Sequence, residues 1–295
     1  MHLVRPALPL HGLVSAGAVG YCAVSAITAT VATSVRRRTP AQPLDTGLDY
    51  EEIEFPATHD ALTLRGWFIA APDSRRLVII VHGKDAHRCN AGIELGALYG
   101  ALAERGFNVL AFDLRGHGLS DGKRLSLGFY EQRDVLGAIA CAKRRGFSAA
   151  SIGILSFSMG AATTLLALPQ TDIRAVVADS AYADLHTLLR GTFARKRVLL
   201  PGVLAMAYLV FGIDVRKVRP AEALRSVSGR RVLLVHGACD RVVPPANLWA
   251  LAIAGGANVV DAWMVPEAEH IRAIALQSQA YFTRVIDFFS AELAG

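Results

Sequence analysis

The chain has 295 residues, of which 53% are hydrophobic and 19% charged, and a formal net charge of +6. This length can bury one full-sized core, and we expect one α/β domain of about 240 residues. The basic residues are scattered and no basic stripe carries interleaved aromatic side chains, so the charge does not indicate a nucleic-acid-binding protein. The cysteines have neither disulfide nor metal spacing, which favours a reducing compartment and predicts no metal site; they are Cys22, Cys89, Cys141 and Cys239.

The amino-terminal segment, residues 1–38, contains a long uncharged stretch. Residues 12–35 include no Asp, Glu, Lys, Arg or His, and as a helix they would span about 36 Å, more than the ~30 Å hydrocarbon core of a bilayer. We favour a transmembrane anchor that associates the protein with a membrane. A cleaved signal peptide, which would give a secreted or periplasmic product, is the alternative, and a buried core helix is a third.

Three arginines, Arg36 to Arg38, follow this stretch directly and precede a linker at residues 39–48. They outweigh Arg5 on the other side, so the positive-inside rule favours a cytoplasmic catalytic domain.

Residues 49–295 alternate between apolar strand-like runs and helical patterns. Continuous apolar strands that alternate with helices predict an α/β fold, with a mostly parallel eight-stranded sheet covered on both faces. The first two strands are expected to form an antiparallel edge hairpin. We predict strands near 51–56, 62–69, 77–81, 107–112, 151–155, 175–179, 231–235 and 259–264, and helices near 92–105, 130–145, 159–168, 246–255 and 274–292.

Residues 181–230 interrupt this rhythm, because they contain no strand signal. Their apolar run, residues 199–212, predicts a small helical cap inserted after the sixth strand. Its apolar face would line an acyl pocket or touch a membrane. An ordinary helix packed on the sheet is the alternative.

The run Ser156-Phe157-Ser158-Met159-Gly160 lies between a predicted strand and a predicted helix. A serine at the apex of such a tight turn presents its hydroxyl beside the first amides of the helix, as in the nucleophile elbow G-x-S-x-G. Small residues are needed two places before and after the nucleophile, because the strand and helix backbones nearly touch there. Ser156 replaces the first glycine of the pattern, and Gly160 supplies the second. Ser158 is therefore the candidate nucleophile.

A serine hydroxyl needs a base to take its proton and a third group to orient that base. In this kind of fold the partners follow in the order acid, then histidine. Asp240 follows the strand-like run 231–235, and His270 follows the strand-like run 259–265. Asp240 is the candidate acid and His270 the candidate base. Asp179, at the end of another predicted strand, is the second choice for the acid.

Two backbone amides should stabilise the oxyanion. One donor is the residue after the nucleophile, Met159, and the other comes from the loop after the third strand, where Lys84 follows His82-Gly83. We expect His82 to brace this loop and not to act as a base.

Together these motifs resemble the α/β-hydrolase superfamily of serine hydrolases. The resemblance covers about residues 52–290 and is greatest to the bacterial branch with serine-aminopeptidase-like, Bem46-like and dienelactone-hydrolase-like members. Ser156 and Lys84-Asp85 depart from the usual pattern. The motifs are Val81-His82-Gly83, Phe112 through Ser120, the Ser158 elbow, His236 through Pro244, and His270.

The resemblance implies acyl transfer to water through an acyl-enzyme intermediate, without a cofactor. The loop 116–122 does not indicate a dinucleotide site, because Asp121 stands where G-x-G-x-x-G requires glycine. The apolar cap and the expected anchor favour a small-molecule or lipid ester as substrate. A peptidase or thioesterase of the same fold, or a catalytically silent membrane-tethered binding protein, are the alternatives.

Overall fold

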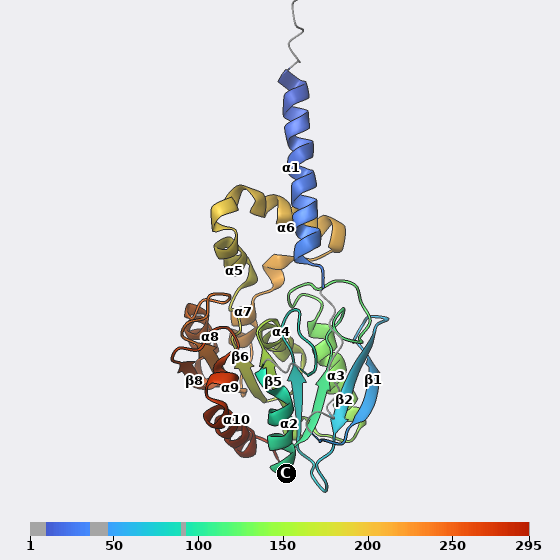
Figure 1. Cartoon of the computed structure of the whole chain (residues 1–295), viewed down its shortest axis with the longest axis vertical. Helices are drawn as coiled ribbons and strands as arrows, with labels where there is room; N and C mark the ends of the chain where they lie inside the picture. Colours follow the sequence, from blue (N-terminus) through green and yellow to red (C-terminus); the bar gives the residue numbers. More distant parts are fainter. Residues whose placement is uncertain (1–9, 36–46, 90–92, 295) are drawn as a thin grey trace, which may run out of the picture.

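The computed structural model describes residues 10–35, 47–89 and 93–294. It contains one eight-stranded sheet in the order β1-β2-β4-β3-β5-β6-β7-β8 (Figure 1). Strand β2 pairs antiparallel with β1 and β4, and the remaining pairs are parallel, which confirms the predicted fold class. The strands are β1 (Glu51–Pro56), β2 (Thr63–Ile69), β3 (Leu77–Val81), β4 (Asn108–Phe112), β5 (Ile152–Phe157), β6 (Ala175–Asp179), β7 (Arg231–Gly237) and β8 (Val259–Val265).

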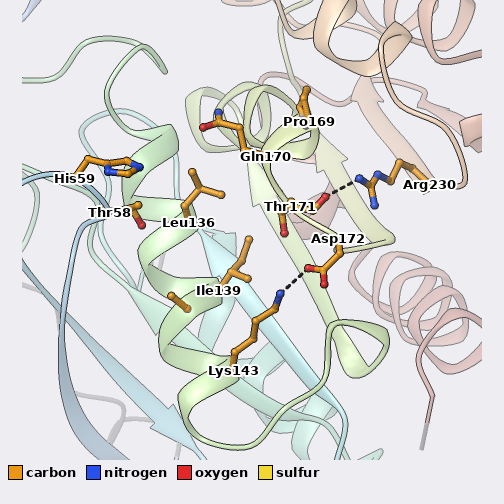
Figure 2. A pocket seen from close by; sticks show the side chains of 11 residues that line it. Thr58, His59, Leu136, Ile139, Lys143, Pro169, Gln170, Thr171, Asp172 and Arg230 are labelled. Carbon is orange, nitrogen blue, oxygen red and sulfur yellow. Dashed lines mark hydrogen bonds and ion pairs between the residues drawn. The ribbon is translucent and has the colours of Figure 1, made fainter.

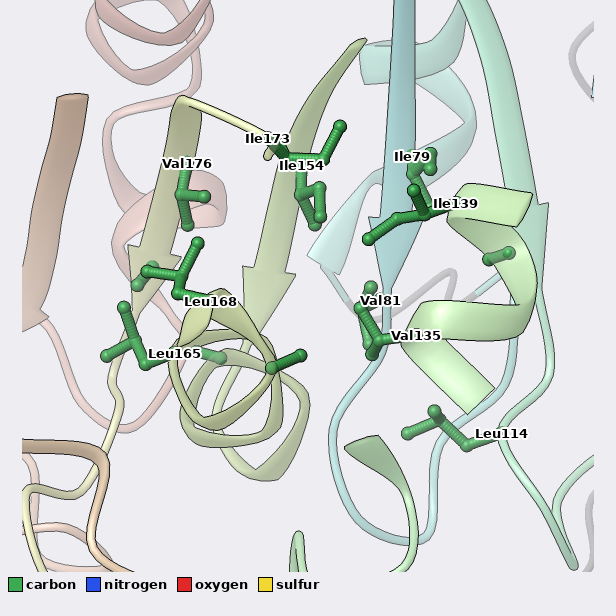
Figure 3. Close-up of a cluster of buried hydrophobic side chains, with 14 of the residues drawn as sticks. Ile79, Val81, Leu114, Val135, Ile139, Ile154, Leu165, Leu168, Ile173 and Val176 are labelled. Atoms are coloured by element: carbon green, nitrogen blue, oxygen red, sulfur yellow. The ribbon is translucent and has the colours of Figure 1, made fainter. Parts of the chain in front are cut away.

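Helices cover both faces of the sheet, so its central strands are buried along their whole length. Helices α2 (Leu95–Glu104) and α10 (Ser278–Glu292) pack on one face. The opposite face carries α3 (Gln132–Arg144), α4 (Met159–Ala167) and α8 (Ala246–Gly255). Figure 3 shows this second core, where Val135 and Ile139 of α3 and Leu165 of α4 meet the sheet side chains.

The predicted final helix, residues 274–292, is two helices. Helix α9 (Ala273–Leu276) ends at Gln277, whose backbone is not helical (φ −132°, ψ 50°). The Gln277 carbonyl then accepts a hydrogen bond from the Tyr281 amide and begins α10. The predicted helix 92–105 is α2, and residues 90–92 lie outside the described residues.

The excursion between β6 and β7 is part cap and part sheet-covering helix. Helix α7 (Pro220–Arg225) buries Leu224 in the same core as α4 and α8. The other elements stand over the carboxyl ends of the strands (Figure 1). They are α5 (Leu185–Thr192), the 3₁₀ helix η5 (Ala194–Leu199), α6 (Leu200–Phe211) and the 3₁₀ helix η6 (Val215–Lys217). A third apolar cluster joins this cap to α4.

Helix α1 (Leu10–Ala32) projects away from the sheet and lies beside α6 (Figure 1). Within the described ranges, no single helix has both the length and the hydropathy of a membrane span. The described side chains of α1 form a shorter apolar helix, Gly17–Ala32, which does not by itself support the transmembrane helix expected over residues 12–35. A bent pair, Ala194–Phe211 with Val215–Arg225, has span-like length and composition, with 94° between the two parts. Residues 36–46, with the three arginines and most of the predicted linker, lie outside the described residues.

Candidate active site

Ser158 occupies a sharp turn between β5 and α4. Its backbone is in a region that side chains rarely adopt (φ 51°, ψ −118°), and its amide donates to the Asp179 carbonyl at 2.8 Å. Such strain persists only where the surroundings impose it, and it is common at functional residues. Ser158 is also the one half-exposed residue between Ser151 and Gly160, so the turn presents its side chain.

The elbow requires very close backbone approach. A Cβ on Gly160 would lie 2.3 Å from the His82 carbonyl oxygen, and one on Gly83 would lie 3.2 Å from the Ser158 Cβ. Ser156 fits at the position usually held by glycine, because its hydroxyl donates to the Val177 carbonyl at 3.0 Å. The departure from G-x-S-x-G therefore adds a buried hydrogen bond without preventing the turn.

The structure brings Ser158, His270 and Asp240 together. His270 Nε2 lies 2.7 Å from Ser158 Oγ, and His270 Nδ1 lies 2.7 Å from Asp240 Oδ2. Asp240 follows β7 and His270 follows β8, so two neighbouring parallel strands deliver them to the same edge of the sheet. In this arrangement the carboxylate fixes the proton on Nδ1 and leaves Nε2 to accept the serine proton.

Asp240 is buried and held by several donors. Its Oδ1 accepts the amides of Val242 at 2.9 Å and Val243 at 2.8 Å. Burial raises the pKa of Asp240, but hydrogen bonds from His236 and His270 outweigh it and hold the pKa below the usual range of an aspartate. The carboxylate is therefore charged at neutral pH.

His236 is a second histidine that contacts the Asp240 carboxylate, and this role was not predicted from the sequence. Its Nε2 lies 2.9 Å from the Val243 carbonyl and 3.3 Å from Asp240 Oδ2. Because both partners are acceptors, Nε2 must carry a proton. Burial lowers the pKa of His236, but these two partners raise it by more. The i, i+4 spacing from His236 to Asp240 was the available signal.

Asp179, the second choice for the acid, is engaged elsewhere. It accepts hydrogen bonds from the Ser180 hydroxyl at 2.8 Å and the Tyr281 hydroxyl at 3.0 Å. The Ile271 amide, next to His270, donates to Ser180 Oγ at 3.3 Å. Burial raises the pKa of Asp179 to about 6, although the hydrogen bonds from the Ser180 and Tyr281 hydroxyls lower it. This buried network supports the loop that carries His270.

Two neutral histidines brace the loop after β3. The Leu114 amide donates to His82 Nε2 at 3.0 Å, so Nδ1 carries the proton and donates to the Gly83 carbonyl at 2.7 Å. His117 Nε2 likewise accepts the Asp85 amide at 3.2 Å. Burial lowers the pKa of both rings. The two rings therefore hold Gly83 and Lys84 in place next to Ser158.

The two candidate oxyanion donors differ in side-chain environment. The Met159 side chain is buried, whereas the Lys84 side chain is exposed and its Nζ lies 3.5 Å from Asp85. An oxyanion hole uses only their amides, which lie directly after Ser158 and after the Gly83 that approaches it.

Sequence comparison places this site in a known family. The chain is 30% identical over 257 residues to the uncharacterized protein YfhR of Escherichia coli, covering 82% of this chain and 81% of that protein. Residues 72–209 match the family model described as serine aminopeptidase, S33. The chain belongs to the serine aminopeptidase-like (S33) family of α/β hydrolases. The uncharacterized protein YqkD of Bacillus subtilis is 30% identical over 192 residues, covering 62% of this chain and 61% of that protein.

Solved structures agree with this family membership. The esterase Pf2001 of Pyrococcus furiosus superposes on this hydrolase with a TM-score of 0.71 and 26% identity, covering 89% of this chain and 98% of that one. Est1E of Butyrivibrio proteoclasticus, in complex with ferulic acid, shares the fold with a TM-score of 0.63 and 20% identity, covering 81% of this chain and 98% of that one. The likeness to the Pyrococcus furiosus esterase supports a hydrolase, and the likeness to Est1E shows the shared fold alone.

A hollow of about 720 Å³ lies elsewhere on the hydrolase, between α3 and the segment after α4 (Figure 2). Its charged groups are already paired: Lys143 contacts Asp172 at 2.6 Å, and Arg230 donates to the Thr171 carbonyl at 2.6 Å. Neither the serine, the acid nor the histidine of the site lines it. We therefore assign it no part in the chemistry.

Proposed function

We propose that the hydrolase cleaves carboxylic esters, with Ser158 as nucleophile, His270 as general base and acid, and Asp240 as the residue that orients His270. One observation carries this proposal: the His270 imidazole joins Ser158 Oγ and Asp240 Oδ2, with 2.7 Å on each side.

In the first half-reaction Ser158 Oγ attacks the ester carbonyl while His270 Nε2 takes its proton. The Met159 and Lys84 amides donate to the oxyanion, and a lost donor of this kind typically costs ~10²–10³ in turnover. His270 then protonates the leaving alcohol, and Asp240 stabilises the imidazolium. In the second half-reaction His270 takes a proton from water as the water oxygen attacks the acyl-enzyme carbonyl. His270 then returns the proton to Ser158 Oγ as the carboxylic acid product leaves.

An ester is the favoured substrate because the Pyrococcus furiosus neighbour is an esterase. A peptidase is the second candidate, since the family model carries the description of a serine aminopeptidase. A thioesterase uses the same chemistry. A silent binding protein is disfavoured, because it would have no need of a histidine placed between a serine and a buried carboxylate.

The test is a comparison of substrates with a matched serine control. We expect p-nitrophenyl esters of several chain lengths to be hydrolysed far faster than aminoacyl p-nitroanilides or acyl thioesters. Ser158→Ala should remove this activity, whereas Ser226→Ala, an exposed serine at the end of α7, should retain it. Faster cleavage of the anilide would favour the peptidase. Turnover of every substrate unchanged in Ser158→Ala would refute the mechanism.

A further inference from the structure

Helix α1 buries small side chains and exposes large apolar ones, the reverse of what is expected for a helix in water. Ser25 and Ala29 are buried, with 0% and 1% of their surface exposed, and both lie on one side of the helix. Val24, Ile27 and Val31 form a stripe on another side and are 47%, 64% and 68% exposed. The hydrophobic effect would select the opposite arrangement if water covered the stripe. The exposed stripe therefore fits apolar surroundings.

Helix α6 and the end of η5 also expose several large apolar side chains. Among the described residues, nine of the fourteen large exposed hydrophobic residues belong to α1 or to this part of the cap. Such gathering marks an interaction surface, because single exposed hydrophobic residues are normally scattered. We define the docking surface as the α1 stripe Val24, Ile27 and Val31 with the cap residues Val198, Tyr208, Leu209 and Val210.

The two halves of the docking surface are held together by a close helix contact. A Cβ on Gly202 of α6 would lie 2.3 Å from Ser25 Oγ, so the helices approach closely there. The Tyr21 hydroxyl donates to the Val198 carbonyl at 2.7 Å and accepts from the Gly202 amide at 3.0 Å. Contacts through small residues are typical of helices that pack within lipid. Whatever covers the α1 stripe thus also meets the neighbouring cap.

A basic collar borders this surface. Residues 185–213 contain no Asp or Glu. They contain four exposed cations that form no ion pair with the described part of the chain: Arg190, Arg195, Lys196 and Arg197. A hollow of about 560 Å³ lies between α1 and η5, and Thr28, Arg195 and Lys196 are among its lining residues. An apolar patch beside unpaired cations complements a surface with anionic headgroups over acyl chains.

We propose that the docking surface binds an anionic lipid bilayer, with the apolar side chains among the upper acyl chains and the basic collar at the phosphates. This contact lies in the interface and needs no membrane span. It places the cap of the hydrolase against the membrane, and it does not depend on which bond the enzyme cleaves.

The first test measures whether the cap enters lipid. In the full chain the two exposed cysteines are replaced (Cys22→Ser, Cys239→Ser), and an environment-sensitive NBD probe is attached to Leu209→Cys. The matched control carries the probe at Ile253→Cys on α8, which is 82% exposed but distant in sequence from α1 and the cap. We expect vesicles of phosphatidylglycerol and phosphatidylcholine to shift the Leu209 emission to the blue, and doxyl-labelled lipid to quench it. The Ile253 probe should change little.

Two results of this test would overturn the proposal. In one, the Leu209 probe responds to vesicles no more than the Ile253 probe. In the other, it is already shielded before vesicles are added, which would mean that a second copy of the chain covers the surface.

The second test concerns the collar. Arg195→Gln/Lys196→Gln/Arg197→Gln should lower the partition coefficient onto these anionic vesicles by about a factor of ten or more, and neutral phosphatidylcholine vesicles should show little difference. The control Arg75→Gln/Arg105→Gln/Arg144→Gln removes three exposed cations at the opposite edge of the sheet and should keep full binding. Equal losses in the two triple variants, or equal binding of the unaltered chain to both kinds of vesicle, would contradict an oriented anionic contact.

Discussion

His236 Nε2 lies 3.3 Å from Asp240 Oδ2, the same carboxylate oxygen that His270 Nδ1 approaches at 2.7 Å. Asp240 is thus fixed by a buried histidine as well as by the histidine that contacts Ser158. The second ring does not reach the serine, so we assign it a positioning role. Its orientation is set in turn by the Val243 carbonyl.

Replacement of His236 should separate positioning from packing. We expect His236→Phe to lower kcat roughly tenfold with little change in KM, because Asp240 loses a hydrogen-bond donor while the ring volume is kept. His236→Gln keeps a donor and should recover most of the loss. Steady-state kinetics on an activated ester would measure both. Equal activities of the two variants would contradict the assigned role.

The buried carboxyl of Asp179 predicts a specific pH dependence of stability. Its pKa is raised to about 6, whereas an unfolded aspartate titrates near ~3.9. Between these values the folded protein keeps a proton that the unfolded chain releases, so this group lowers the free energy of unfolding as pH rises from about 4 to about 6.

Asp179→Asn cannot titrate and should lack that decrease. Relative to the unaltered protein, its free energy of unfolding should improve by on the order of 2 kcal/mol between pH 4 and pH 7. Urea unfolding across this range would measure the difference, and Asp134, whose pKa is also raised to about 6, contributes equally to both proteins. Parallel stability curves would show that Asp179 does not titrate in this window.

Gly160→Ala should prevent the elbow from forming. The added Cβ would lie 2.3 Å from the His82 carbonyl oxygen and 2.7 Å from that of Val81, and neither backbone can move without shifting β3. We expect a loss of about 3 kcal/mol or more of stability, or no folded protein. Gly191→Ala in α5 is the control, since its Cβ would meet nothing within 4 Å. Similar melting temperatures for the two variants would disprove the close approach.

Gly202→Ala should loosen α1 from the cap without unfolding the sheet. Its Cβ would clash with Ser25 and with the Tyr21 ring, where the nearest ring atom is 2.7 Å away. We expect trypsin to cut faster after the exposed cations Arg195 to Arg197, while the melting temperature of the domain stays nearly unchanged. Gly191→Ala again serves as the control. An unchanged cleavage rate would mean that this contact does not hold η5 in place.

Much of the sheet could be predicted because its strands are continuous apolar runs that end in polar or glycine residues, as in 77–83 and 231–237. The break at Gln277 could not, since no glycine or proline marks it and the buried Ile274 and Tyr281 on either side keep a helical spacing. The local hydrophobic pattern predicts which segments are buried. It does not predict a backbone break that no glycine or proline marks.

The same limit applies around the site. Ser158, Asp240 and His270 could be selected as candidates because each follows a strand, and parallel strands gather their carboxyl ends at one edge. The contact between Tyr21 and Gly202 joins residues 181 apart in the sequence. It depends on the Tyr21 hydroxyl and on the absence of a side chain at Gly202, and no local sequence pattern predicts it. The length of the uncharged run favours a span, but it gives no sign that its small residues Ser25 and Ala29 form a buried helix-packing face.

The most direct test of Ser158 as the nucleophile is the intact mass of the protein after treatment with a fluorophosphonate, followed by peptide mapping. We predict one adduct on the unaltered protein, located on Ser158, absent from Ser158→Ala and present in Ser226→Ala. The reason is that His270 Nε2 lies 2.7 Å from Ser158 Oγ and is placed to take its proton. No adduct on folded protein, or an adduct on another residue that persists in Ser158→Ala, would contradict the assignment of Ser158 as the activated nucleophile.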